Sequence, residues 1–248
     1  MTNMHNYRLR RTTTSVCVAI LTGAERNSWI HPNLLMTCLR MPIWQQETGS
    51  QLFITTVHGK TPVDSARNVA VQEMLKAKAE WLLQIDNDVA PPMNVLAILE
   101  NIGNRKIVGL PCPIEFDGGP SFISTGKFAL NIATKRGEDL HELHLRTASG
   151  WTEMDNVGSG CMLVHRDVFE SLKEPWFECS RKSGYTYGED FGFCDKARAA
   201  GFSVWTHGGF PCRHYKTVDL GECLRATTQA IQLAPIPGLL EQEQDKTK

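Results

Sequence analysis

The chain has 248 residues, of which 42% are hydrophobic and 21% are charged. This composition is typical of a soluble globular protein that is long enough to bury a core. Its 26 Lys and Arg residues nearly balance its 27 Asp and Glu residues, which disfavours tight binding to nucleic acid or to another polyanion. No apolar run approaches the roughly 20 residues that cross a bilayer, so we expect no transmembrane segment.

The eight cysteines lie far apart, and no two of them form a Cys-x-x-Cys pair. Several stand inside apolar runs such as VCVAIL and GCMLV. No signal-peptide pattern precedes them, so we expect reduced core thiols and a cytoplasmic protein. Disulfides and a structural zinc site are the less favoured alternatives.

Apolar runs and helix-compatible stretches alternate along the chain. Residues 15–21 and 52–57 are predicted strands, with a helix near 32–40 between them. Such alternation is typical of βαβ units on a sheet that is buried on both faces. The later expected elements are strands at 81–85, 106–110, 157–165 and 202–206 and helices from 61 and at 93–101, 167–172 and 189–200.

The periodic pattern weakens at residues 111–151, which contain Gly118-Gly119-Pro120. We expect loops and small hairpins there, forming a smaller mixed β region that shapes a substrate site. The predicted organisation is therefore a flexible N-terminal segment at 1–14, a single α/β domain at 15–234 and a polar tail at 235–248.

The triplet Asp86-Asn87-Asp88, a DxD motif, directly follows the apolar run WLLQI and precedes a double proline. Because side chains alternate along a strand, residues two apart project the same way, and two carboxylates then share a small space. A divalent cation removes their repulsion, and carboxylate oxygens suit Mn²⁺ or Mg²⁺. Open α/β sheets also bind ligands beyond the carboxyl ends of strands. The same triplet is common in solvated turns, but its position favours a cation site.

Two further groups carry titratable side chains. Glu189 and Asp190 open a predicted helix, where the helix dipole favours acidic residues and where either carboxylate can also serve as a general base. His207 and His214 follow the last predicted strand, and a neutral imidazole at either position suits Mn²⁺-like ions. A lone histidine more often has a structural role than a metal-binding one.

The predicted helix at 61 begins with a capping pattern, in which Thr61 caps and Pro62 suits the first turn. Asp64, Arg67 and Asn68 then lie near its open end, where they orient a nucleotide or act only as capping and surface charge.

Glycines flank Ser159 in the segment Gly158-Ser159-Gly160. They let the backbone approach a ligand closely and serve a tight bend equally well. Neither a dinucleotide fingerprint nor a P-loop spacing is present in the sequence.

Five segments, taken together over residues 15–217, resemble the GT-A glycosyltransferases, particularly the family-2-like group. They are VAILTG, DSARNVAVQEML followed by WLLQIDNDVAPP, GSGCMLVHRDVFE, YGEDFGFCDKARAAGF and the late CRHYK. The resemblance implies a Rossmann-like, mostly parallel central sheet flanked by helices. It also implies a UDP- or GDP-linked sugar as donor, whose diphosphate is held by Mn²⁺ or Mg²⁺.

The resemblance assigns roles to particular residues. It implies Asp86 and Asp88 as metal ligands with His214 as a possible third, and Asp190, or failing it Glu189, as the base of an inverting displacement. The residues implied to contact the donor or line its site are Thr22, Arg26, Asp64, Arg67, Asp86, Asn87, Gly158, Ser159 and Gly160. CRHYK departs from the usual His-x-Gly, so His207 competes for the metal role.

The acceptor is a hydroxyl group that the sequence does not identify, and saccharide, lipid-linked, protein and modified nucleic-acid acceptors all fit. Two other functions also fit the sequence. One is nucleotidyl transfer on the same fold, and the other is non-catalytic binding of a nucleotide or carbohydrate.

Overall fold

The structure is a computed structural model that describes residues 13–23, 29–114, 129–130, 132–133, 150–182 and 185–216. Apart from Ile114, Ala129 and Lys216, these residues belong to one compact unit. Arg26, most of the predicted loop region at 111–151 and the predicted tail at 235–248 lie outside the described residues. The predicted domain boundaries therefore stay predictions.

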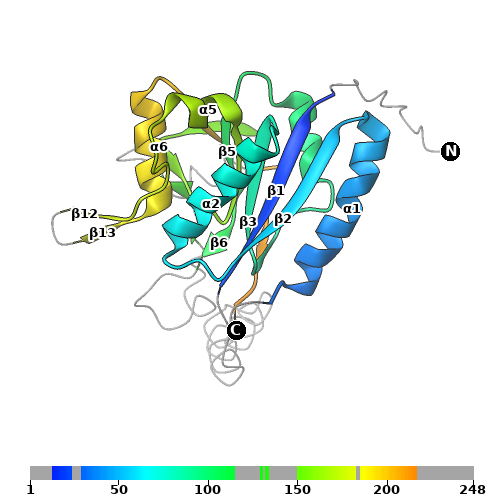
Figure 1. Cartoon of the computed structure of the whole chain (residues 1–248), viewed down its shortest axis with the longest axis horizontal. Coiled ribbons are helices and arrows are strands. Elements are labelled where there is room, and N and C mark those ends of the chain that lie inside the picture. Colours follow the sequence, from blue (N-terminus) through cyan, green and yellow to red (C-terminus); the bar gives the residue numbers. More distant parts are fainter. Residues whose placement is uncertain are drawn as a thin grey trace, which may run out of the picture. The chain divides into compact units, whose positions relative to one another are not determined.

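In the described part of the chain, the centre of this unit is a seven-stranded sheet of order β2-β1-β3-β11-β5-β14-β9 (Figure 1). Its strands are β1 (Ser15–Thr22), β2 (Gln51–His58), β3 (Trp81–Asp86), β5 (Ile107–Gly109), β9 (Trp151–Met154), β11 (Cys161–His165) and β14 (Val204–His207). Only β9 and β11 run against the other five. The predicted mostly parallel sheet is confirmed.

Short strands make up the rest of the β structure that is described. They are β4 (Val89–Ala90), β6 (Pro113–Ile114), β7 (Ala129–Leu130), β8 (Ile132–Ala133), β10 (Asn156–Val157), β12 (Ser180–Lys182), β13 (Tyr185–Tyr187) and β15 (Arg213–His214). The antiparallel pair of β15 with β4 matters most for function, because it attaches a late segment of the chain to the end of the acidic triplet.

Helices cover both faces of the sheet, as the continuous apolar strands predict. The helices are α1 (Pro32–Thr48), α2 (Val63–Lys76), the 3₁₀ helix η2 (Val95–Asn101), α5 (Arg166–Ser171) and α6 (Glu189–Ala199). Alternate residues of β1 enter two cores, one shared with α2, α5 and α6 and the other with α1 and η2. Figure 1 shows α2 in front of the sheet and α1 beside the edge strand β2.

Two helix boundaries differ from the prediction. α1 runs on past Arg40 to Thr48 with Pro42 inside it, because its packing continues beyond the proline: Trp44 packs against the same core as Met41, and Thr48 is buried. The predicted Thr61 cap of α2 is wrong, since Pro62 is the N-cap residue and no side chain caps the helix.

Six of the seven described cysteines are buried, and all seven are free thiols, which agrees with the predicted reduced core. Cys179 is the exposed exception. Within the described residues, no helix has both the length and the apolar character that a membrane span requires.

Candidate active site

The acidic triplet lies at the carboxyl end of β3, as predicted. Asp86 is the last residue of β3, while Asn87 and Asp88 form a turn before β4. Strand alternation therefore does not place Asp88 beside Asp86, and the prediction was wrong on that point. The turn does bring the two carboxylates near each other: desolvation raises the pKa of Asp86, Arg67 opposes this, and the charge of Asp88 raises the pKa further.

Backbone hydrogen bonds join the triplet to four other segments of the chain. Asp86 N donates to Gly160 O (2.9 Å), Asn87 N donates to Leu21 O (3.1 Å), His31 N donates to Asn87 O (2.9 Å) and Tyr215 N donates to Asp88 O (2.9 Å). These donors and acceptors come from β1, the start of α1, the turn before β11 and the end of β15. The turn is therefore fixed by the fold and does not depend on solvent for its conformation.

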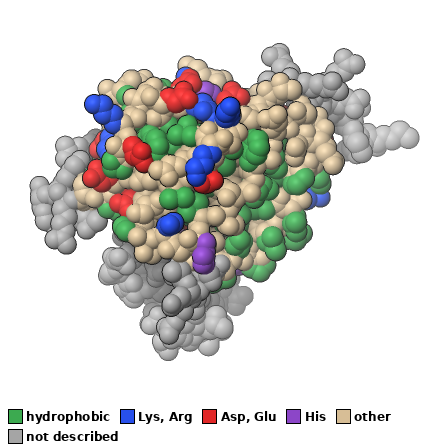
Figure 2. Space-filling view, in the orientation of Figure 1, with side chains coloured by type: hydrophobic (Ala, Val, Ile, Leu, Met, Phe, Trp, Pro, Cys, Tyr) green, Lys and Arg blue, Asp and Glu red, His purple; other side chains and the backbone are tan. Residues whose placement is uncertain are grey.

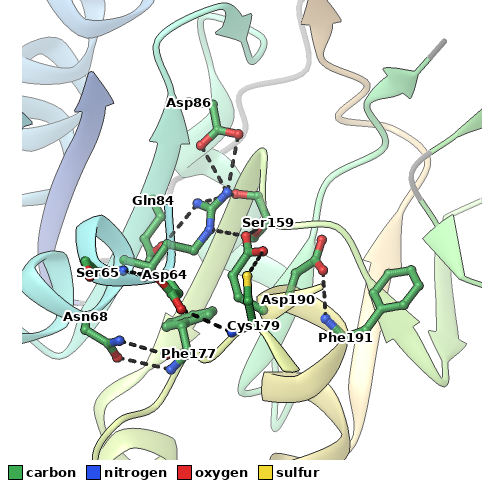
Figure 3. Close-up of polar contacts among 12 residues, drawn as sticks. Asp64, Ser65, Asn68, Gln84, Asp86, Ser159, Phe177, Cys179, Asp190 and Phe191 are labelled. Atoms are coloured by element: carbon green, nitrogen blue, oxygen red, sulfur yellow. Dashed lines mark hydrogen bonds and ion pairs between the residues drawn. The ribbon is translucent and has the colours of Figure 1, made fainter. Parts of the chain in front are cut away.

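Arg67 on α2 lies beneath the triplet and is only 3% exposed. Its Nε donates to Glu189 Oε1 (2.8 Å), and its Nη2 lies 3.2 Å from Asp86 Oδ1. Its Nη1 donates to the carbonyl oxygen of Ser159 (3.1 Å), and Figure 3 shows these bonds converging between Asp86, Gln84 and Ser159. In this arrangement Arg67 joins Asp86 to α6, the helix that begins with Glu189 and Asp190.

Three carboxylates act on this one guanidinium, and a fourth, Asp88, acts on Asp86. Burial acts to lower the pKa of Arg67, but the charges of Asp86, Glu189 and Asp190 outweigh it and raise that pKa, so Arg67 stays protonated. One positive charge does not balance Asp86, Asp88, Glu189 and Asp190 together. The remaining negative charge favours an added cation at the site.

We expect Arg67→Met to lower the free energy of unfolding by about 3–5 kcal/mol, because it leaves the buried Glu189 carboxylate without its counter-ion. Urea unfolding followed by circular dichroism measures this. The matched control is Arg198→Met, whose guanidinium is 43% exposed and lies 3.1 Å from Asp155. That exposed pair is expected to contribute less than about 1 kcal/mol. Equal losses in the two variants would contradict a buried charge cluster at Arg67.

The two acidic residues at the start of α6, Glu189 and Asp190, lie in different environments. Glu189 is 9% exposed. Its Oε1 accepts hydrogen bonds from Arg67 and from the Ser159 hydroxyl (3.3 Å), and its Oε2 accepts one from the Cys179 thiol (3.7 Å). Asp190 is half-buried, and Figure 3 shows its carboxylate accepting from Phe191 N (2.8 Å). Burial raises the pKa of Asp190, and the charge of Glu189 raises it further. No described side chain forms an ion pair with Asp190, so its carboxylate makes fewer side-chain contacts than that of Glu189.

His214 contacts the triplet, whereas the contacts of His207 are with other residues. His214 Nε2 lies 3.4 Å from Asp88 Oδ2, while its Nδ1 lies 2.8 Å from Pro113 O. In the neutral tautomer that donates its Nδ1 proton to that carbonyl, Nε2 is the nitrogen that faces Asp88 and is available to bind a metal ion. His207 instead accepts from Gly209 N (2.9 Å) and packs edge-on against Trp151.

The donor set was tested for its fit to a divalent cation. Among the described residues no three His, Cys, Asp or Glu side chains are grouped closely enough to hold a metal ion. Asp88 and His214 offer two ligands of the right chemistry, and Mg²⁺-type ions are usually held by one or two carboxylates together with substrate phosphates and water. The residues therefore fit a cation that shares its coordination with a bound diphosphate.

The other predicted site residues border the same region or support it. Thr22 is buried at the end of β1 with its hydroxyl 3.1 Å from His58 Nδ1, and the Asn87 amide donates to Trp29 O (2.8 Å). Asp64 accepts from Cys179 N (3.1 Å). Ser159 is 2% exposed. Asn68 is structural, because its amide bonds both the N–H and the carbonyl of Phe177.

The sequence reasoning missed an aromatic pair beside the triplet. The rings of His31 and Tyr215 stack at 3.5 Å between centroids with 9° between their planes, and the Asn33 amide donates to the Tyr215 hydroxyl. Trp29 meets His31 edge-on and is 46% exposed. The only sequence signal was local: His31 precedes Pro32 and caps α1 by accepting from Asn33 N (3.2 Å).

No protein-family model matches the chain, and no curated protein sequence matches it. Solved structures do match. A197 from STIV has a TM-score of 0.53 at 15% identity, over 82% of this chain and 86% of that one. GalNAc-T7 with UDP, GalNAc and Mn²⁺ has a TM-score of 0.49 at 13% identity, over 88% of this chain and 48% of that one. The inositol-1-phosphate CTP transferase from T. maritima has a TM-score of 0.44 at 9% identity, over 92% and 100%.

At these identities the likeness concerns the fold and does not extend to the chemistry. The fold of this chain is a mostly parallel sheet with helices on both faces. The chain has a GT-A-like α/β fold.

Proposed function

We propose that this chain is a metal-dependent glycosyltransferase that moves a sugar from a UDP- or GDP-linked donor to an acceptor hydroxyl. One observation carries the proposal. Buried Arg67 lies between an acidic turn, where Asp88 faces His214, and Asp190, a carboxylate that forms no ion pair with any described side chain. Transfer of a sugar from a diphosphate needs both parts, a place for the departing charge and a base for the incoming hydroxyl.

Asp190 is the proposed base. Its raised pKa makes it a better proton acceptor than an ordinary aspartate, and its position at the start of α6 leaves the carboxylate half-exposed to an acceptor. It takes the proton from the acceptor hydroxyl as that oxygen attacks the anomeric carbon. The bond from that carbon to the diphosphate oxygen breaks at the same time, so the configuration of the sugar is inverted.

Glu189 and Arg67 have supporting roles in this proposal. Glu189 anchors the start of α6 to Arg67 and so sets where its neighbour Asp190 lies. Arg67 holds Asp86 from below. Asp88 and His214 would hold a divalent cation, Mn²⁺ or Mg²⁺, which would neutralise charge on the diphosphate. Trp29 and the stacked His31–Tyr215 pair offer an aromatic surface for the nucleotide beside the triplet.

A thermal-shift screen of nucleotide sugars tests the proposal. With Mn²⁺, a UDP- or GDP-sugar at a hundredfold excess over its Kd is expected to stabilise the native state by about 2.7 kcal/mol. For a domain of this size that raises the Tm by about 5–10 °C. The shift is expected to shrink strongly when EDTA removes the metal.

Three outcomes would contradict the proposed function. If no nucleotide sugar raised the Tm, the proposal that the donor is a nucleotide sugar would be wrong. Release of pyrophosphate from nucleoside triphosphates would support nucleotidyl transfer instead. Binding of a donor without its hydrolysis or transfer, across a broad set of acceptors, would indicate a non-catalytic binding protein.

A further inference from the structure

The helix α1 is apolar on the side that faces away from the sheet. Its inward side buries Leu34, Cys38 and Met41. Its outward side, here called the α1 outer face, consists of Leu35, Met36, Leu39 and Ile43, which are 50%, 48%, 61% and 43% exposed. A surface helix normally carries polar residues on its outward side, and one that is apolar on both sides is normally covered.

The apolar surface continues beyond α1. Ile54 on β2 is 45% exposed, and β2 is the edge strand of the described sheet. Figure 2 shows hydrophobic side chains gathered over the region that α1 and β2 occupy in Figure 1. On the other flank of α1, a groove of about 290 Å³ is lined by Ile43 and Trp44 and by Met93, Leu96 and Ala97 from the η2 side.

Two opposite charges, Arg40 and Glu47, line the same groove. They stand two helical turns apart on one flank of α1, and neither has an ion pair with any described residue. Burial raises the pKa of Glu100 across the groove, and the charge of Glu47 raises it further. A cation brought to this end of the groove would relieve that repulsion.

We propose that the α1 outer face and this groove form an interface between two copies of this chain. Arg40 and Glu47 lie equally far before and after the midpoint between Ile43 and Trp44. If a two-fold axis passes through that midpoint, the two α1 helices run antiparallel, and Arg40 of each copy lies against Glu47 of the other. Isologous interfaces require this self-complementarity. Ile43 then lies at the centre, where it enters the groove of the other copy.

The charges disfavour a lipid surface as the occupant. The exposed side of α1 carries one cation and one anion, with no lysine anywhere in the helix. Helices that lie on a membrane carry a strongly basic polar face that meets anionic headgroups. A second copy of the chain, in contrast, supplies both the missing apolar cover and the missing counter-charges.

Sedimentation velocity of the full chain over a hundredfold range of concentration tests the proposal. We expect a dimer whose Kd rises at least about tenfold in Arg40→Glu and in Glu47→Arg, because each reversal sets two like-charge pairs across the interface. The double variant R40E/E47R is expected to regain wild-type association. Leu39→Glu is expected to be monomeric, and Lys173→Glu, an exposed charge reversal elsewhere, is the control that stays dimeric.

Several results would overturn the proposal. One is a wild-type chain that is monomeric throughout the concentration range. Another is a double variant R40E/E47R that associates no better than the single variants, which would contradict the antiparallel pairing of Arg40 with Glu47. A monomer that cosediments with anionic phospholipid vesicles, and loses that binding in L39E, would assign the surface to a membrane. Circular dichroism spectra identical to wild type establish that each variant is folded, as expected for exposed sites.

Discussion

Asp88→Ala is expected to lower metal-dependent turnover of the nucleotide sugar by at least about 10³-fold while the protein stays folded. Asp88 is 20% exposed in a turn that is held by backbone bonds, and His214 Nε2 lies 3.4 Å from its carboxylate. The substitution removes a carboxylate from the proposed cation site, so the departing diphosphate is expected to be stabilised less. Release of nucleoside diphosphate at saturating Mn²⁺ measures the effect, with urea unfolding as the test of fold.

Two further substitutions sharpen this result. Asp155→Ala is a matched control, because that carboxylate pairs with the exposed Arg198 and lies outside the proposed site. It is expected to leave turnover unchanged. Asp86→Ala is a poorer test than Asp88→Ala, because it removes a partner of buried Arg67 and so affects stability as well as activity. Full activity in Asp88→Ala would exclude the proposed cation site.

Asp190→Asn is expected to lower kcat by about 10²–10⁴-fold with little change in the KM for the donor, because the amide cannot accept the proton of the acceptor hydroxyl. Glu189→Gln is the matched variant. Its main expected effect is on stability, since Glu189 is bound to Arg67 at 2.8 Å and is 9% exposed. The two variants thus separate the base from the residue that positions it.

The pH dependence of activity is a second test of Asp190 as the general base. A general base works in its deprotonated form, so activity is lost as the pH falls through its pKa. Burial and the charge of Glu189 raise the pKa of Asp190, so wild-type activity is expected to begin to fall at a higher pH than an ordinary aspartate would give. The residual activity of Asp190→Asn is expected to lack this acidic limb. An unchanged limb in that variant, together with its loss in Glu189→Gln, would make Glu189 the base.

The sequence by itself determined the order of the elements and the place of the acidic triplet. Apolar runs such as 15–21 and 81–85 are local signals, because a strand buried on both faces needs apolar residues at nearly every position. A polar triplet that interrupts such a run marks the end of the strand, so Asp86 was placed correctly without the structure. Helix ends were less well predicted, since the packing of α1 overrides Pro42 and no side chain caps α2.

Only the tertiary structure decided how the charged residues are used. The bond from Arg67 to Glu189 joins residues 122 positions apart, and it forms because α2 and α6 cover the same face of the sheet. The pairing of β15 with β4 brings His214, and not His207, to Asp88. Residue type and spacing do not encode which of several carboxylates an arginine meets, because that choice depends on packing between distant segments. For the same reason, residue type alone left open which of Glu189 and Asp190 is the base, although the resemblance put Asp190 first. The burial of Glu189 beside Arg67 supports Asp190 in the proposed role.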